Sequence, residues 1–156
     1  VKGRMVFPLM EVWRHSQDVI HRFKQAQNAV LFAAGSCWEG VDFPGDMVSS
    51  LIIVRLPFPV PDPLSEAERE QYPSLQDYIK TVVIPDMQVK LRQGFGRAIR
   101  TETDTCVVSI LDHRAAPGER YHKAVLETLP PIRITSKIED VEDFIRAKKG
   151  PDYFMP

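Results

Sequence analysis

Two arginines and a glutamine are spaced so that their side chains could contact one phosphate group together. Gln93, Arg97 and Arg100 lie in the segment KLRQGFGRAIR, which covers residues 90–100. On a helix of 3.6 residues per turn, Arg97 falls at roughly +40° and Arg100 at roughly −20° from Gln93. Guanidinium groups stay charged and match phosphate oxygens in geometry. This face therefore suits a polyphosphate that loses its terminal group, although most arginine faces of surface helices are simply solvated.

The opposite side of the same helix is apolar. Leu91, Phe95 and Ala98 point away from the glutamine and the arginines, as in a helix that packs on a sheet. Gly94 and Gly96 each cost about 1 kcal/mol relative to alanine inside a helix, and residues this small permit close approach of a ligand or another backbone. The two glycines therefore favour a binding role for this helix.

A glycine-rich loop forms a second group of candidate residues. Residues 35–45 read GSCWEGVDFPG and follow residues 29–34, which we expect to form a strand buried on both faces of a parallel sheet. Glu39 and Asp42 could bind a hydroxyl, a cation or a backbone amide, and Trp38 offers a flat apolar face. A capping role for Asp42 and a core role for Trp38 explain these two residues equally well. Ligands of open α/β sheets bind at the carboxyl ends of the strands. The loop and the arginine helix could thus contact one nucleotide from two sides.

Helices and strands alternate along the chain. We expect strands over residues 4–7, 29–34, 49–56, 105–111 and 132–135. We expect helices over residues 12–26, 64–72 with Ser65 as a candidate N-cap, 75–83, from about Pro85 to 100, 119–129 and 138–149. Residues 57–63 contain four prolines and should form an extended loop. This alternation predicts one α/β domain with a layered, mostly parallel central sheet flanked by helices.

Composition and known motifs narrow the functional classes. The 156 residues carry a formal net charge of −1, so an anion site must be local. Two cysteines, Cys37 and Cys106, are too few for a disulfide framework. No apolar run approaches the roughly 20 residues that span a bilayer. We therefore expect a cytoplasmic protein without membrane contact. No G-x-x-x-x-G-K-[ST] motif is present, and the histidines lack zinc-binding spacing, so we expect no metal site. The chain begins with Val1 and looks like a piece of a longer protein.

The two candidate groups resemble motifs of a known family. Residues 35–45 resemble motif V, and residues 93–100 resemble motif VI, of superfamily-2 DNA helicases of the DinG/XPD type. The segments LPFP, residues 56–59, and LDHR, residues 111–114, also resemble connecting segments of that family, in the same order and spacing. The resemblance extends from about Phe23 to Phe144, and the first residues show no clear motif IV.

The resemblance implies that residues 1–156 are the second RecA-like motor domain of an ATP-dependent DNA helicase involved in DNA repair. The first motor domain of the same chain, absent here, would supply the phosphate loop and bind most of the ATP and Mg²⁺. Arg97 and Arg100 would reach the γ-phosphate across the interdomain cleft as catalytic residues, with Arg100 the better candidate for an arginine finger. The resemblance implies nucleotide contacts for Gln93, Gly96, Glu39, Gly40 and Asp42, and single-stranded DNA contacts for Gly35, Ser36 and Trp38.

Members of this family often carry an iron–sulfur cluster on four cysteines. The two cysteines of this sequence cannot hold such a cluster, so it could lie only in the absent part. The main alternative function is a non-catalytic module that binds single-stranded nucleic acid or a protein partner. A nuclease or phosphatase remnant is the third hypothesis, and no metal-binding carboxylate cluster in the sequence supports it.

Overall fold

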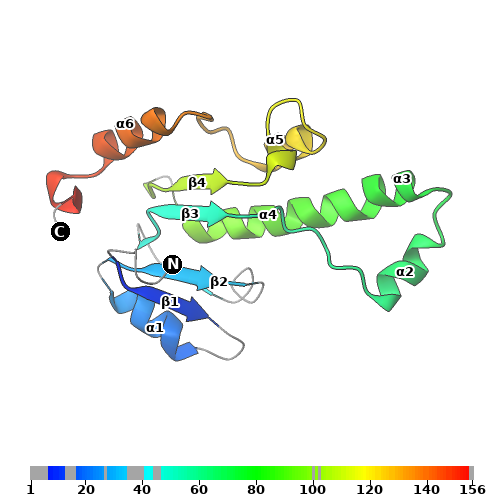
Figure 1. Cartoon of the computed structure of the whole chain (residues 1–156), viewed down its shortest axis with the longest axis horizontal. Helices are drawn as coiled ribbons and strands as arrows, with labels where there is room; N and C mark the ends of the chain where they lie inside the picture. The colour runs from blue at the N-terminus through cyan, green and yellow to red at the C-terminus, as the bar shows by residue number, and fades with distance from the viewer. Residues whose placement is uncertain are drawn as a thin grey trace.

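Short parallel strands and surrounding helices build the part of the chain that the structure describes. This computed structural model describes residues 7–12, 17–26, 28–34, 41–43, 47–99, 101 and 103–154 (Figure 1). Strand β1 (Leu9–Val12) pairs with β2 (Val30–Ala33), and β3 (Ser50–Ile53) pairs with β4 (Val107–Ile110). Both pairs are parallel, and the four arrows of Figure 1 point the same way. The expected parallel α/β architecture is confirmed, although the described strands form two separate pairs instead of one continuous sheet.

Helical segments connect and cover these strands. They are α1 (Gln17–Gln25), α2 (Pro63–Arg69), α3 (Leu75–Tyr78), the π-helical segment η4 (Ile79–Val83), α4 (Ile84–Ala98), α5 (His122–Thr128), α6 (Ile138–Lys148), and the 3₁₀ turns η5 (His113–Ala115) and η6 (Pro151–Phe154). The expected closing helix matches α6 closely, and the expected helix over residues 119–129 is the shorter α5.

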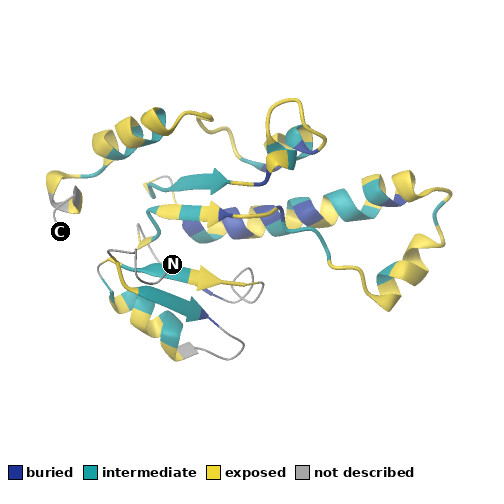
Figure 2. Ribbon diagram, viewed as in Figure 1, coloured by how far each residue is buried: buried dark blue, intermediate teal, exposed yellow. Residues whose placement is uncertain are grey.

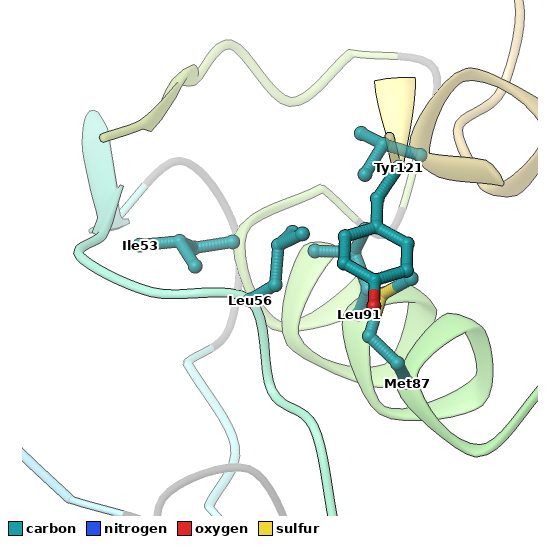
Figure 3. Close-up of a cluster of buried hydrophobic side chains, with 6 residues drawn as sticks. Ile53, Leu56, Met87, Leu91 and Tyr121 are labelled. Carbon is teal, nitrogen blue, oxygen red and sulfur yellow. The ribbon is translucent and has the colours of Figure 1, made fainter. Parts of the chain in front are cut away.

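The core lies between α4, the β3–β4 pair and α5. Its buried side chains come from the end of β3, from one face of α4 and from the start of α5: Ile53, Leu56, Met87, Leu91, Tyr121 and Val125 (Figure 3). Met87 and Leu91 are fully buried, so α4 is fixed firmly against the sheet. Each such side chain contributes about 1.5–3 kcal/mol through the hydrophobic effect. This packing determines which face of α4 is left for other partners.

The helix that carries Arg97 begins earlier than expected, and it ends at Ala98 instead of residue 100, because Ile99 is already extended. We expected it to start near Pro85, but α3, η4 and α4 follow one another without interruption from Leu75 to Ala98. The N–H of Ile84 donates to the carbonyl of Ile79, five residues earlier, which is the π-helical pattern. A proline in a regular helix clashes with the carbonyl four residues before it, and the wider π turn relieves this conflict. The chain can therefore pass Pro85 without a break.

Several expected boundaries are wrong. The first described strand, β1, begins directly after Pro8, whose carbonyl accepts a hydrogen bond from the N–H of Val30 at 2.9 Å. Phe7 is not part of a strand, and the rest of the strand expected over residues 4–7 lies outside the described residues. Val12, expected in a helix, ends β1. Phe32 of β2 is 49% exposed, so this strand is not buried on both faces in the described structure.

Two more local expectations need correction. Residues 132–135 are irregular, because they follow two prolines and no described strand pairs with them. The N-cap of α2 is Asp62 and not Ser65. Ser65 occupies the third helical position, where its hydroxyl accepts from the N–H of Asp62 at 2.8 Å while the Asp62 carboxylate accepts from the N–H of Ser65. This reciprocal pair is a capping box that lies three residues earlier than expected, with Ser65 at the N3 position instead of the N-cap.

Candidate functional site

A hydrogen bond joins the arginine helix to the end of the glycine-rich loop. The Nη1 atom of Arg97 donates to the carbonyl oxygen of Val41 at 2.9 Å, across 56 positions of sequence. Arg97 is partly buried, in the last turn of α4, where the helix dipole favours a positive charge. The next residue after α4, Ile99, is already extended. The structure therefore brings the two candidate groups together through this one arginine.

The acceptor of this hydrogen bond is held in place by its neighbours. Val41 and Phe43 are both buried, and the ring of Phe43 packs edge-on against Phe23 of α1 with ring centroids 5.6 Å apart. Asp42 lies between them and is exposed. The buried side chains of Val41 and Phe43 therefore anchor the segment that presents this carbonyl to Arg97.

The polar and apolar sides of α4 follow the expected pattern. Leu91, Phe95 and Ala98 are buried, and Gln93 is exposed. Gly96 is also exposed, and a Cβ atom added to it would have nothing within 4 Å. The described part of this domain therefore does not itself require a glycine at this position.

The remaining candidates cannot be placed. Residues Gly35, Ser36, Trp38, Glu39, Gly40 and Arg100 lie outside the described residues. Their roles stay predictions, as do the nucleotide contacts of Gln93, Gly96 and Asp42.

A buried carboxylate that the sequence did not single out fastens the ends of β3 and β4. Asp112 is 8% exposed and accepts from the N–H of Leu56 at 2.9 Å. It also accepts from the backbone N–H, Nε and Nη2 of Arg114 at 3.1, 2.9 and 2.7 Å. These bonds, first of all those of the Arg114 side chain, hold the pKa of Asp112 well below its ordinary value although burial alone would raise it. The carboxylate in turn raises the pKa of Arg114.

Arg114 extends this link to the proline-rich segment. Its guanidinium lies 4.8 Å from the ring centroid of Phe58 and 5.9 Å from that of Tyr121, and the two ring centroids are 4.8 Å apart. These cation–π and ring contacts hold Phe58 near the carboxyl ends of β3 and β4. The sequence offered two signals here: a carboxylate two residues before an arginine at the end of a strand, and the resemblance of residues 111–114 to a connecting segment of the family. Neither signal reveals a partner 56 positions away.

Other site types find no support in the described structure. Among the described residues, no three His, Cys, Asp or Glu side chains gather where they could hold a metal ion. Cys106 is partly buried, and its thiol donates to the carbonyl oxygen of Val107 at 3.5 Å. No described helix combines the length and the apolar character that crossing a membrane requires.

Comparisons with known proteins identify the family. A family model described as "Helicase C-terminal domain" matches residues 8–132. The chain is 40% identical over 112 residues to the ATP-dependent DNA helicase DinG of Photobacterium profundum, which covers 70% of this chain and 16% of that protein. It is 39% identical over 147 residues to the ATP-dependent DNA helicase YoaA of Escherichia coli, with 92% of this chain and 23% of that protein covered.

A third relative carries a different description. The 3'-5' exonuclease DinG of Bacillus subtilis is 35% identical over 130 residues, which cover 81% of this chain and 14% of that protein. A solved XPD helicase structure has a TM-score of 0.63 at 22% identity, over 82% of this chain and 24% of that chain, and it supports the RecA-like α/β fold. The chain spans less than a quarter of the length of each of these proteins. The matches confirm the resemblance to DinG/XPD-type helicases, and the chain belongs to the helicase C-terminal domain family.

Proposed function

We propose that this chain is the second motor domain of an ATP-dependent DNA helicase and that it completes an ATP site formed with a first motor domain. The hydrogen bond from Arg97 to Val41 carries this proposal, because it links the motif VI helix with the motif V loop. Two relatives with about 40% identity are named ATP-dependent DNA helicases. The full-length protein would be cytoplasmic and would act in DNA repair.

Arg97 and Arg100 would have different roles at the terminal phosphate. A guanidinium carries five N–H donors in a planar fork, so one Arg97 side chain can hold the Val41 carbonyl and contact a phosphate oxygen together. Arg97 would thereby make the position of the motif V loop dependent on the nucleotide. Arg100 would act as the arginine finger that stabilises the charge of the transition state. Both arginines are catalytic residues in this proposal.

The other candidates would surround the same nucleotide. Gln93 and Gly96 lie on the exposed side of α4 near Arg97, and Asp42 is exposed next to Val41. We assign nucleotide contacts to these three and to Glu39 and Gly40. ATP and Mg²⁺ would be held mainly by the first motor domain. An iron–sulfur cluster, if the full-length protein has one, would also lie outside this chain.

Single-stranded DNA would cross the carboxyl ends of the strands. We assign contacts with it to Gly35, Ser36 and Trp38, and to the proline-rich residues 57–63. The link between Asp112 and Arg114 supports the second assignment, since it holds Phe58 of that segment at the strand ends. Phosphate contacts dominate binding of this kind, so the affinity should fall with salt and depend little on sequence.

The proposal is tested by Arg97→Ala in the full-length protein. We expect DNA-stimulated ATP hydrolysis to fall by about 10²-fold or more, while the affinity for ATP changes only a few-fold. Arg69→Ala is the control, because Arg69 is an exposed arginine in α2, far along the chain from the site. Hydrolysis that stays at the wild-type rate in Arg97→Ala would overturn the proposal.

The alternative is a module that binds single-stranded nucleic acid or a protein partner without hydrolysing ATP. A G-x-x-x-x-G-K-[ST] motif upstream in the same reading frame would favour the helicase, and its absence would favour the module. The exonuclease relative favours neither the helicase nor the non-catalytic module, because this chain covers only 14% of that protein.

A further inference from the structure

The guanidinium of Arg114 is held in one orientation from two directions. Its Nε and Nη2 atoms both donate to the carboxylate of Asp112, at 2.9 and 2.7 Å, and two parallel bonds of this kind fix the plane of the group. The ring of Phe58 lies against that plane, with its centroid 4.8 Å from Cζ of Arg114. The side chain is therefore oriented before any ligand arrives.

Most of the hydrogen-bond donors of this guanidinium are still available. A guanidinium has five N–H donors, and the bonds to Asp112 use one on Nε and one on Nη2. No described residue accepts from the other three donors, and the side chain of Arg114 is 39% exposed. An exposed guanidinium whose orientation is already fixed suits an oxygen anion from outside the domain, because little side-chain entropy is lost on binding.

The surroundings of Arg114 favour a phosphate of nucleic acid as that anion. Two more exposed arginines flank the same aromatic rings: Arg55 lies three residues before Phe58, and Arg120 lies over the ring of Tyr121 at 5.3 Å. The two segments that contribute these residues, 55–58 and 111–121, contain three arginines and two acidic residues, whereas the whole chain has a net charge of −1. Surfaces that combine arginines with aromatic side chains are typical of single-strand binding.

Arg114 and Arg97 lie toward opposite ends of the strands. Helix α4 runs in the opposite direction to β3 and β4, so Arg97 in its last turn lies toward the amino ends of these strands (Figure 1). Arg114 is in η5, which follows the carboxyl end of β4. After Phe58 the chain leaves this edge through the exposed residues 60–62 and the largely exposed α2 (Figure 2). A ligand at the carboxyl ends can therefore contact Arg114 without contacting Arg97.

We infer that Arg114 binds a backbone phosphate of single-stranded DNA at the carboxyl ends of β3 and β4, and that Asp112 and Phe58 hold its guanidinium in the binding orientation. The inference rests on the proposed function, which places the DNA strand across this edge. Arg114 is a DNA contact in this assignment. Asp112 is a positioning residue, because it acts on the DNA only through Arg114.

Binding of a fluorescein-labelled oligothymidylate to the full-length protein without nucleotide tests the contact. Arg114→Gln should weaken binding by about fivefold or more. The slope of the logarithm of affinity against the logarithm of salt concentration should become shallower by about 0.7, because one phosphate contact is lost. Arg146→Gln is the matched control, since Nε and Nη2 of Arg146 also contact one carboxylate, that of Glu142, but in α6. This control should change neither the affinity nor the slope.

The salt slope separates a DNA contact from a purely structural role. If Arg114 only stabilises the fold, Arg114→Gln will lower the affinity without changing the slope, and that result would overturn the inference. Unchanged affinity and slope would overturn it as well. Circular dichroism at the assay temperature verifies that each variant is folded.

Asp112→Asn separates the orientation of Arg114 from its charge. The substitution removes a negative charge near the DNA, but it also loosens the guanidinium, because an amide has one acceptor oxygen where a carboxylate has two. If the orientation matters, the affinity should fall about two- to threefold with the slope unchanged. A rise in affinity would show that Arg114 acts through charge alone, and it would overturn the positioning role of Asp112.

Hydrolysis kinetics distinguish this inference from the proposed function. Arg114→Gln should raise the DNA concentration for half-maximal stimulation of ATP hydrolysis by about fivefold, and this effect should exceed any fall in kcat at saturating DNA. A fall in kcat with the half-maximal DNA concentration unchanged would overturn the inference. Wild-type hydrolysis in Arg97→Ala would overturn the proposed function, whatever the DNA binding of Arg114→Gln shows.

Discussion

Replacing Asp112 should destabilise the domain far more than replacing a carboxylate on its surface. Asp112→Ala removes the acceptor of four hydrogen bonds, one from Leu56 and three from Arg114. The N–H of Leu56 would then be buried without this acceptor, at a cost of about 1–3 kcal/mol. The lost charge-assisted bonds to Arg114 add about 1–2 kcal/mol, a reduced value because the side chain of Arg114 is 39% exposed. We expect a total loss of about 3 kcal/mol in the free energy of unfolding.

Urea denaturation of the 156-residue chain measures this loss. Asp112→Asn should cost less, about 1–2 kcal/mol, since its amide oxygen can still accept from Leu56. Asp18→Asn is the control: Asp18 pairs with Arg22 at 3.5 Å, but both side chains are mostly exposed, so we expect less than about 0.5 kcal/mol. A loss for Asp112→Ala no larger than that of the control would refute the reasoning.

The pH dependence of the same measurement tests the charge of Asp112. Its pKa is lowered in the folded state, below the value of about 3.9 expected for an unfolded chain. The stabilisation is therefore fully present above about pH 5 and is lost as the pH falls through the folded-state pKa. The difference in unfolding free energy between wild type and Asp112→Asn should be constant from pH 7 to pH 5 and should shrink below pH 4. A difference that stays constant down to pH 2 would show that the ionised carboxylate is not responsible.

Two further substitutions separate stability from function. Gly96→Ala should raise the free energy of unfolding of this chain by about 0.5–1 kcal/mol, because alanine is the better helix former and its methyl group meets nothing in the described structure. The same substitution should slow ATP hydrolysis in the full-length protein. Urea denaturation and an ATPase assay check the two effects, and a faster ATPase would contradict the proposed contact at Gly96. Asp62→Ala should lower the free energy of unfolding by about 1 kcal/mol, because it removes the capping box of α2. Amide hydrogen exchange at Ser65 and Glu66 should become faster, and ATP hydrolysis should not change.

Periodic features of the fold were predictable from the sequence. The faces of α4 follow from a 3.6-residue repeat, so the burial of Leu91, Phe95 and Ala98 could be predicted without a structure. The parallel α/β architecture follows in the same way from apolar runs that alternate with helical segments.

Features that depend on distant partners were not predictable. Pro85 is a local stop signal, and only the structure reveals the π turn that lets the helix pass it. Residues 132–135 have a strand-like composition, but a strand needs a neighbour, and no described strand lies beside them. Asp112 gains its role from Leu56 and Arg114, of which only Arg114 is near in sequence.

The candidate site divides in the same way. The helix pattern predicted that Gln93 and Arg97 lie on related faces, and the residue types of the loop predicted a binding region over residues 35–45. Their meeting depends on the carbonyl of Val41, a backbone atom that no sequence motif distinguishes. The position of that atom depends on the contact between Phe23 and Phe43, and the sequence does not indicate that these two rings pack together.

The central claim is that this domain supplies an arginine finger to an ATP site shared with another domain. The most direct test is ATP hydrolysis by full-length protein carrying Arg100→Ala, measured with single-stranded DNA in excess and together with the affinity for ATP. We predict a fall in hydrolysis of about 10³-fold or more with ATP binding largely intact. Undiminished DNA-stimulated hydrolysis in this variant would contradict the account.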